Sequence, residues 1–189
     1  PTAAFAVCGG PPVARVNIAD HQFWLGAAVA DFVISLRTIG AEHARLRRGA
    51  MRNVVLPVPL EEPISNLGRA DSRRALGIPA EQIVLLTVGR AEKYRPCGSY
   101  DFVDTCAKIL STIPEARLYV VGESLEGISP HLRCPVPERM QFVGPVADPT
   151  LYRAAADVYL ESFPFGSQTA LLESALMGLP VVPALDPPF

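Results

Sequence analysis

The chain has 189 residues, 49% of them hydrophobic, and a formal net charge of −2. This length supports a sizeable core, and the hydrophobic content excludes a disordered chain. The slightly acidic balance argues against a protein whose main task is to bind nucleic-acid phosphates. No apolar run reaches about 18 residues, so no membrane-spanning helix is expected. Four cysteines without Cys-x-x-Cys spacing indicate reduced thiols in a cytoplasmic protein.

Over the first 60 residues, short β-branched runs alternate with a helical stretch. The expected elements are strands at 13–16, 31–35 and 53–56 and a helix at 41–48. The proline-rich sequence PVPLEEP then breaks periodic structure and predicts a linker at 57–70. Residues 1–60 are expected to end one domain and residues 71–189 to form a second. The chain begins within apolar sequence and stops after a strand, so both domains are expected to be truncated.

Strands and helices continue to alternate after the linker. The apolar run Ile83–Val88 is typical of a strand buried on both faces, and Asp71 is expected to cap a helix that ends near Gly77. The further expected elements are strands at 117–121, 140–143, 158–160 and 181–182 and helices at 99–112, 151–156 and 169–177. This alternation predicts βαβ units around a parallel sheet, so the expected fold class is α/β.

A cationic loop follows the apolar strand Ile83–Val88. Its sequence GRAEKYRP contains Arg90, Lys93 and Arg95, and open parallel sheets bind ligands at the carboxyl ends of their strands. Lysine and arginine at that place can neutralise a diphosphate; the alternative is a solvated loop. Neither a Gly-x4-Gly-Lys-Ser/Thr loop nor a Gly-x-Gly-x-x-Gly turn follows a strand, which argues against ATPases and dinucleotide-binding proteins.

A second candidate segment leads from the strand at 158–160 into a helix through Gly166, Ser167, Gln168 and Thr169. The unpaired N–H groups and the dipole of a helix start favour anions, and Gly166 allows close backbone approach. Glu173 lies one turn further on the same helix face, where its carboxylate suits ribose hydroxyls better than phosphate. The alternative is that Ser167 caps the helix and Glu173 faces water. Together with the cationic loop, this segment predicts a nucleoside-diphosphate site that needs no metal.

Other candidates carry weaker signals. Val143 and Gly144 end a strand, and their backbone groups are candidates for reading the edge of a base. His21 follows the strand at 13–16 and is a candidate base for an acceptor hydroxyl, with a structural or acceptor-positioning histidine as the alternative. Trp24 is expected in the core. The arginines of RLRRGAMR (45–52) either contact anionic lipid or lie at a solvated helix end.

Five blocks of the sequence occur in the order typical of nucleotide-sugar glycosyltransferases of GT-B architecture, which the chain resembles over nearly all of its length. They are RRALGIPAEQIVLLTVGRAEKYRP, IPEARLYVVG, MQFVGPV, LYRAAADVYLES and LLESALMGLPVV. The resemblance implies a Rossmann-like donor-binding domain at 71–189 and the end of the acceptor-side domain at 1–60. It also implies that Arg90 and Lys93 bind the donor diphosphate, that the helix start at 166–169 cradles it, and that Glu173 binds the ribose.

The chain combines features of two branches of that family. Family-4-type retaining enzymes usually carry a second acid eight residues before the ribose-binding one, where this chain has Phe165. Their lysine usually stands at the position of Arg95. The segments EKYRP and FPFGSQTALLES are closer to the inverting O-linked N-acetylglucosaminyltransferase type. The resemblance therefore leaves retention and inversion open.

The function implied is transfer of a hexosyl or N-acetylhexosaminyl group from a nucleoside-diphosphate sugar to a hydroxyl of a saccharide, lipid-linked or protein acceptor. Lys93, Arg90 and the helix start would stabilise the leaving diphosphate, with no metal or cofactor. The alternatives are a nucleotide-sugar epimerase, a glycosyl phosphorylase and a non-catalytic nucleotide-sugar-binding module. The expected location is the cytoplasm, either free or peripheral at the cytoplasmic face of the membrane, with no nucleic-acid partner. The fragment alone is expected to be inactive.

Overall fold

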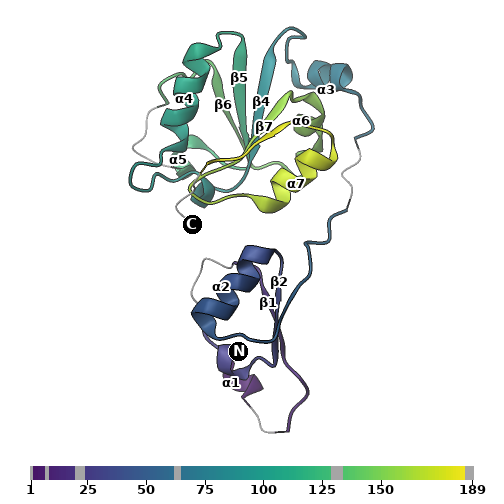
Figure 1. The fold of residues 1–189 in the computed structure, drawn as a ribbon. Helices are drawn as coiled ribbons and strands as arrows, with labels where there is room; N and C mark the ends of the chain where they lie inside the picture. Colours follow the sequence, from purple (N-terminus) through teal and green to yellow (C-terminus); the bar gives the residue numbers. More distant parts are fainter. Residues whose placement is uncertain (1, 7–8, 20–23, 62–64, 129–133, 186–189) are drawn as a thin grey trace. The chain divides into compact units, whose positions relative to one another are not determined.

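The computed structural model describes all residues except 1, 7–8, 20–23, 62–64, 129–133 and 186–189. The chain divides into two compact units, Pro1–Pro59 and Leu60–Phe189, and each unit has its own parallel sheet (Figure 1). Within the described ranges, every helix is too short or too polar to cross a lipid bilayer.

The first unit contains a three-stranded parallel sheet. Its strands are β1 (Ala14–Asn17), β2 (Phe32–Ser35) and β3 (Asn53–Val55), in that spatial order. The helix α2 (Thr38–Arg48) connects β2 to β3 and packs against both. It ends at Gly49, which has the left-handed φ of 64° that suits glycine at a helix end. A short helix, α1 (Thr2–Phe5), precedes the sheet, and a 3-10 turn (Ala27–Val29) lies between β1 and β2.

Trp24 in this unit packs against two arginines and is only half-buried. The guanidinium carbon of Arg15 is 4.1 Å from the centroid of the indole ring, and that of Arg48 is 5.3 Å away. Both distances lie within the range of cation–π attraction. The prediction that Trp24 belongs to the hydrophobic core is therefore wrong, because cationic side chains cover its ring.

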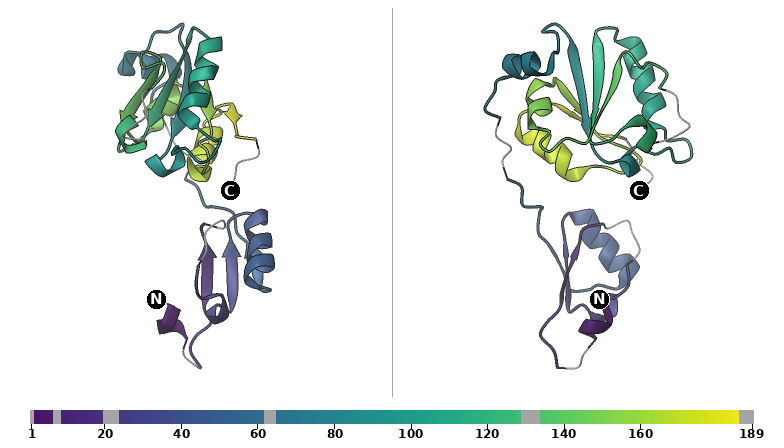
Figure 2. Two further views of the ribbon diagram at one scale, coloured as in Figure 1. Left: turned by 90° about the vertical axis from the view of Figure 1, so that its left-hand side faces the viewer. Right: turned by 180° about the vertical axis from the view of Figure 1, so that it is seen from behind.

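The second unit is a three-layer α/β structure. Its sheet consists of the parallel strands β4 (Ile83–Val88), β5 (Ala116–Val121), β6 (Met140–Gly144), β7 (Val158–Leu160) and β8 (Val181–Val182). Its helices are α3 (Arg69–Leu76), α4 (Phe102–Thr112), α5 (Leu125–Ile128), α6 (Thr150–Ala155) and α7 (Gln168–Leu176). Helices α4 and α5 cover one face of the sheet, and α3, α6 and α7 cover the other (Figures 1 and 2). The predicted α/β class with parallel sheets is confirmed.

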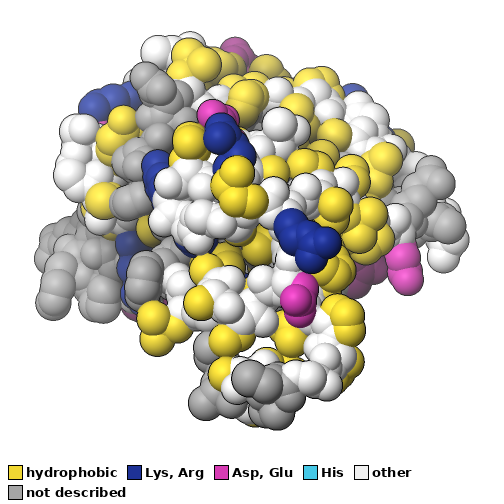
Figure 3. Space-filling model, turned by 60° about the horizontal axis from the view of Figure 1, so that its bottom comes forward, with side chains coloured by type: hydrophobic (Ala, Val, Ile, Leu, Met, Phe, Trp, Pro, Cys, Tyr) yellow, Lys and Arg dark blue, Asp and Glu magenta, His cyan; other side chains and the backbone are white. Residues whose placement is uncertain are grey.

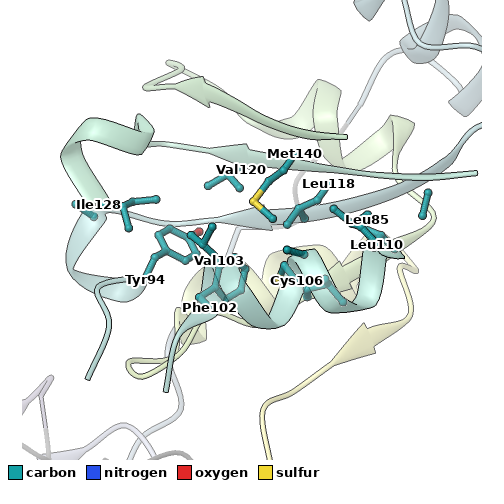
Figure 4. Close-up of a cluster of buried hydrophobic side chains, with 14 residues drawn as sticks. Leu85, Tyr94, Phe102, Val103, Cys106, Leu110, Leu118, Val120, Ile128 and Met140 are labelled. Atoms are coloured by element: carbon teal, nitrogen blue, oxygen red, sulfur yellow. The ribbon is translucent and has the colours of Figure 1, made fainter. Parts of the chain in front are cut away.

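Alternate residues of the central strands supply the two cores of this unit. Leu85, Leu118 and Val120 point toward α4 and pack against its buried side chains (Figure 4). Their neighbours in sequence, among them Leu86 and Tyr119, face the opposite helical layer. Burial on both faces explains why these strands appear in the sequence as continuous apolar runs.

The strand order places the ends of β4 and β7 side by side. The sheet is ordered β6-β5-β4-β7-β8, so the chain moves outward from β4 to β6 and then returns to the other side of β4. The helix that follows β4 covers one face, and the helix that follows β7 covers the other. Open α/β sheets bind ligands at such a switch point, outside the carboxyl ends of the strands.

The helix α3 is anchored by one of two adjacent arginines. Arg73 is buried, and its guanidinium donates to Ala155 O at 2.9 Å, to Ala80 O at 2.7 Å and to Asp157 Oδ2 at 2.6 Å. The next residue, Arg74, is exposed and pairs with Asp71 at 2.6 Å. Asp71 lies in the first turn of α3, which starts after Gly68, so the prediction that Asp71 caps this helix is wrong.

Candidate functional site

A buried tyrosine anchors the loop after β4 to the core of the second unit. Tyr94 is fully buried, and its hydroxyl lies 3.1 Å from Thr87 Oγ1. Ala91 is also buried, at the start of a 3-10 turn (Ala91–Lys93). With these two side chains inside, Arg90 remains exposed and Lys93 half-buried. The loop therefore presents its cations at the carboxyl edge of the sheet from a fixed backbone.

Two glycines bring the strand ends and the start of α7 into close contact. A Cβ on Gly89 would lie 2.9 Å from Tyr94 Oη and 3.0 Å from Ser167 Oγ. Gly122, after β5, has a φ of 110°, and a Cβ there would lie 2.5 Å from Gly89 O. No side chain fits at either place. The sequence analysis did not single out these residues, because only the neighbouring strand reveals the constraint.

The two predicted segments meet at Lys93. Its Nζ donates a hydrogen bond to the carbonyl oxygen of Gly166 at 2.7 Å, so the loop after β4 touches the segment that leads into α7. Within the described part of the chain, the side chain of Lys93 has no acidic partner, and the side chain of Arg90 makes neither a hydrogen bond nor an ion pair. Lys93 therefore lies beside the start of α7, and Arg90 adds a second, exposed cation to the same loop.

The first turn of α7 leaves backbone N–H groups open. Ser167 occupies the N-cap position, as the alternative expected, but its side chain makes no capping hydrogen bond. The first N–H bonded in the helical pattern is that of Leu171, which donates to Ser167 O. The amides of Gln168, Thr169 and Ala170 have no acceptor among the residues that the structure describes. Such groups at the positive end of a helix attract anions.

Glu161 holds the turn before α7 and was missed by the sequence analysis. It follows β7, is 9% exposed, and accepts hydrogen bonds on Oε1 from Ser162 N at 3.0 Å and from Ser167 N. This internal carboxylate shapes the turn that Lys93 contacts. An acid directly after an apolar strand was its only signal in the sequence, and its acceptor role depends on how the chain folds back.

Glu173 is held by a buried arginine. Arg153 of α6 donates from Nη2 to Glu173 Oε2, and its side chain is 3% exposed against 29% for Glu173. The alternative in which Glu173 only faces water is therefore wrong. Oε1 of Glu173 accepts no hydrogen bond from any residue in the described ranges. Arg153 was also missed; a single basic residue in the apolar sequence LYRAAA was its only signal.

The remaining candidates are less closely connected to this site. Val143 packs against the core on the α6–α7 face, and Gly144 O accepts a hydrogen bond from Gly122 N at 2.8 Å. These contacts hold the end of β6 in place, and a role in base recognition stays a prediction. His21 lies outside the described residues, so its role stays a prediction too. No group of three or more His, Cys, Asp or Glu side chains in the described ranges is arranged to hold a metal ion.

The surface of the second unit has a hollow near the amino ends of its strands, whereas the candidate site lies at their carboxyl ends. This hollow is lined by residues that precede β7 and β8, including Asp157 and Pro180, and by Arg69 of α3. On the face shown in Figure 3, basic and acidic side chains occur in small separate groups among apolar ones. The candidate site is identified by the contact of Lys93 with Gly166 and by the backbone N–H groups at the start of α7 that have no acceptor in the described ranges.

Comparisons with known proteins agree with this geometry. The profile of the family described as Glycosyl transferases group 1 matches residues 82–184, which is more than half of the chain and includes both the Lys93 loop and α7. Among curated proteins, none matches the sequence.

Three solved structures illustrate the likeness of fold. Sucrose-phosphate synthase from Thermosynechococcus elongatus is 24% identical with a TM-score of 0.59, and the match covers 83% of this chain and 42% of that one. Anabaena Alr3699/HepE, in complex with UDP and glucose, is 21% identical with a TM-score of 0.68, over 91% of this chain and 52% of that one. WaaG, a glycosyltransferase involved in lipopolysaccharide biosynthesis, is 22% identical with a TM-score of 0.64, over 80% and 43%.

At these identities the structural likeness establishes the fold, and the chain spans about half the length of these proteins or less. The expected α/β fold of GT-B glycosyltransferases is thereby confirmed. The family profile covers the strands, the cationic loop and the α7 start that form the candidate site. The chain belongs to the family of group 1 glycosyl transferases.

Proposed function

We propose that residues 60–189 bind the nucleoside-diphosphate sugar of an enzyme that transfers its sugar to an acceptor hydroxyl. The observation that carries this proposal is the contact of Lys93 with Gly166 at the switch point between β4 and β7. It joins a cationic loop to an open helix start, and both features favour the binding of a diphosphate. HepE, a protein of similar fold, was solved with UDP and glucose bound.

The proposed roles of the cations follow from the negative charge that develops on the leaving diphosphate during sugar transfer. In the transfer, the acceptor oxygen forms a bond to the anomeric carbon, the bond between that carbon and a phosphate oxygen breaks, and its electron pair stays on the leaving diphosphate. Lys93 and Arg90 would stabilise this growing charge with open amides of α7. The N–H of Ser167 is already bonded to Glu161, so the diphosphate would bind the amides from Gln168 onward. The proposal requires no divalent ion, because cations and a helix start supply the positive charge.

Separate residues are proposed for the ribose and for the acceptor. Glu173 has one carboxylate oxygen without a partner in the described ranges, and a carboxylate is a strong acceptor for the ribose hydroxyls. His21 is the proposed base that takes the proton of the acceptor hydroxyl. The backbone groups of Val143 and Gly144 are proposed to contact the edge of the nucleobase.

The finer assignment draws on the two branches of the family. Phe165 stands where family-4-type enzymes carry an acid, and the contact to Gly166 comes from Lys93, while Arg95 reaches toward Gly127 O at 3.5 Å. We propose a family-4-like chain with a donor site of the O-linked N-acetylglucosaminyltransferase type, which transfers a hexosyl or N-acetylhexosaminyl group. The acceptor would be a saccharide, a lipid-linked molecule or a protein.

Residues 1–59 are proposed to be the end of the acceptor-side domain. Arg45 and Arg47 on α2 and Arg52 after it are exposed, so this unit is suited to peripheral contact with anionic lipid. That contact would place the enzyme at the cytoplasmic face of a membrane. The proposal also holds that the 189 residues alone do not transfer sugar efficiently.

A panel of nucleotides tests the donor-binding proposal by thermal shift. UDP or GDP is expected to raise the melting temperature of the chain, since a ligand that binds only the folded state stabilises it. NAD and ATP are expected to have no effect. If no nucleoside diphosphate changes the melting temperature, the proposal is wrong. A response to inorganic phosphate alone would instead favour a phosphorylase.

Gly166→Ala is expected to weaken the binding of UDP or GDP and to leave the stability of the chain nearly unchanged. A Cβ on Gly166 would lie 3.6 Å from Glu161 Oε1, an ordinary contact, so the change in unfolding free energy should stay within about 0.5 kcal/mol. The methyl group would nevertheless stand where the diphosphate approaches the backbone. Isothermal calorimetry and urea unfolding would measure the two effects.

Gly122→Ala is the matched control for this glycine. Its Cβ would meet the backbone oxygen of Gly89 at 2.5 Å, and its φ of 110° is strained for alanine. This variant is expected to lose more than about 2 kcal/mol of stability. Equal stability losses for the two alanine variants would show that Gly166 is needed for folding and not for ligand approach.

A further inference from the structure

The buried side chain of Arg153 connects the two helices that pack behind the candidate site. Its Nη2 donates to Glu173 Oε2, and its Nε donates to Ser174 Oγ at 3.3 Å. The hydroxyl of Ser174 donates in turn to Ala170 O at 2.7 Å, one turn back along α7. A single guanidinium on α6 therefore engages two successive side chains of α7.

The two oxygens of Glu173 have different surroundings. Oε2 is bonded to a guanidinium that is almost completely buried, whereas Oε1 has no partner in the described ranges. A glutamate on an exposed helix surface samples several rotamers. Here the bond to Arg153 restricts the side chain to orientations that keep Oε2 against α6 and leave Oε1 available.

We propose that Arg153 is a positioning residue that orients Glu173 for the ribose hydroxyls of the nucleotide. The inference rests on the donor-binding function proposed above and adds a residue to the recognition of the sugar ring of the nucleotide. Arg153 itself does not touch the ligand. It acts through the carboxylate, since the fork geometry of a guanidinium fixes both the distance and the direction of its partner.

The competing explanation is that Arg153 only joins α6 to α7. A buried charge pair of this kind destabilises a protein when one partner is removed, so a loss of stability would not separate the two explanations. Discrimination between nucleotides with and without ribose hydroxyls does separate them. A purely structural arginine would change the affinity for all nucleotides by the same factor.

The experiment compares UDP and GDP with their 2′-deoxy and 3′-deoxy analogues by calorimetry on the folded chain. In the wild type, removing a hydroxyl that bonds to Glu173 is expected to weaken binding about tenfold or more. Arg153→Met is expected to remove most of this discrimination and to leave the affinity for the deoxy analogue nearly unchanged. Arg153→Lys, which keeps the charge and lacks the fork, is expected to restore part of it.

Two further variants serve as controls that separate a positioning role of Arg153 from a purely structural one. Ser174→Ala removes the second partner of Arg153 and leaves the bond to Glu173, so it should cost stability and keep the discrimination. Glu173→Ala should abolish the discrimination, and adding Arg153→Met to it should change nothing further. If Arg153→Met does not fold, the lysine variant and the Ser174→Ala control still decide between the two explanations.

The outcomes distinguish this inference from the proposed function. A wild type that binds UDP or GDP with ribose discrimination, together with arginine variants that discriminate equally well, would overturn the inference and leave the proposed function standing. A wild type that binds no nucleoside diphosphate would overturn both. Binding without ribose discrimination in the wild type would overturn the ribose role of Glu173 and that of Arg153 with it.

Discussion

Lys93→Ala is expected to weaken the binding of UDP or GDP about 10- to 100-fold, because the diphosphate loses a charge-assisted hydrogen bond worth about 1.5–3 kcal/mol. In the complete enzyme, sugar transfer should fall further, by about 100- to 1000-fold, since the lost cation would stabilise the charge that develops on the leaving group. The unfolding free energy should change by less than about 1 kcal/mol. In the described part of the chain, the side chain of Lys93 makes one exposed hydrogen bond, to Gly166 O.

Arg95→Ala is the matched control, because it removes a cation from the same loop. The Nη2 of Arg95 lies 3.5 Å from Gly127 O, on the side of α5, while Lys93 reaches the start of α7. The arginine variant is therefore expected to bind nucleotide within about twofold of the wild type. If the two variants exchanged their effects, the loop would work as in family-4-type enzymes, with Arg95 at the diphosphate. Equal binding by the Lys93→Ala variant and the wild type would refute the diphosphate role of Lys93.

Arg73→Ala is expected to destabilise the second unit by about 3–5 kcal/mol, the cost typical of removing one partner of a buried charge pair. The substitution would leave Ala155 O and Ala80 O without their donor and would remove one of the partners of Asp157. Val84 N also donates to Asp157 Oδ2, at 2.7 Å, so the strand β4 shares this network. Urea unfolding, followed by circular dichroism, measures the loss.

Arg74→Ala provides the control one position along the same helix. The side chain of Arg74 is 78% exposed, and its ion-pair partner, Asp71, is exposed as well. Surface ion pairs of this kind contribute little, so the change should be below about 0.5 kcal/mol. If both alanine variants lost equal stability, the network around Arg73 would not be what anchors α3.

The sequence predicted the strands well because a strand that is buried on both faces appears as an apolar run in the sequence. Ile83–Val88 is apolar except for Thr87, and the structure has β4 over those residues. The helix expected at 99–112 starts later, at Phe102, because Asp101 accepts a hydrogen bond from Asp104 N at 2.9 Å and so caps it. Local patterns therefore located the elements, and side-chain capping set their ends.

The strand order and the buried polar contacts could not be predicted in the same way. No local sequence pattern indicates that β7 lies beside β4. This pairing of the two strands nevertheless brings Lys93 to Gly166. Arg153 and Glu173 are twenty positions apart. A polar residue in an apolar stretch of sequence does not indicate which distant residue it will bond to. Glu161 was missed for the same reason, since its main partner lies across a turn of the chain.

The carboxylate of Glu161 has a consequence for product release in the proposed enzyme. A site that stabilises a leaving diphosphate too strongly would keep it after the transfer and slow every later turnover. Because Glu161 occupies the N–H of Ser167 and places a fixed negative charge beside the helix start, it offsets part of the attraction there. The remaining attraction comes from Lys93 and Arg90, whose flexible side chains can follow the diphosphate outward. Glu161 would thus favour turnover over retention of the product.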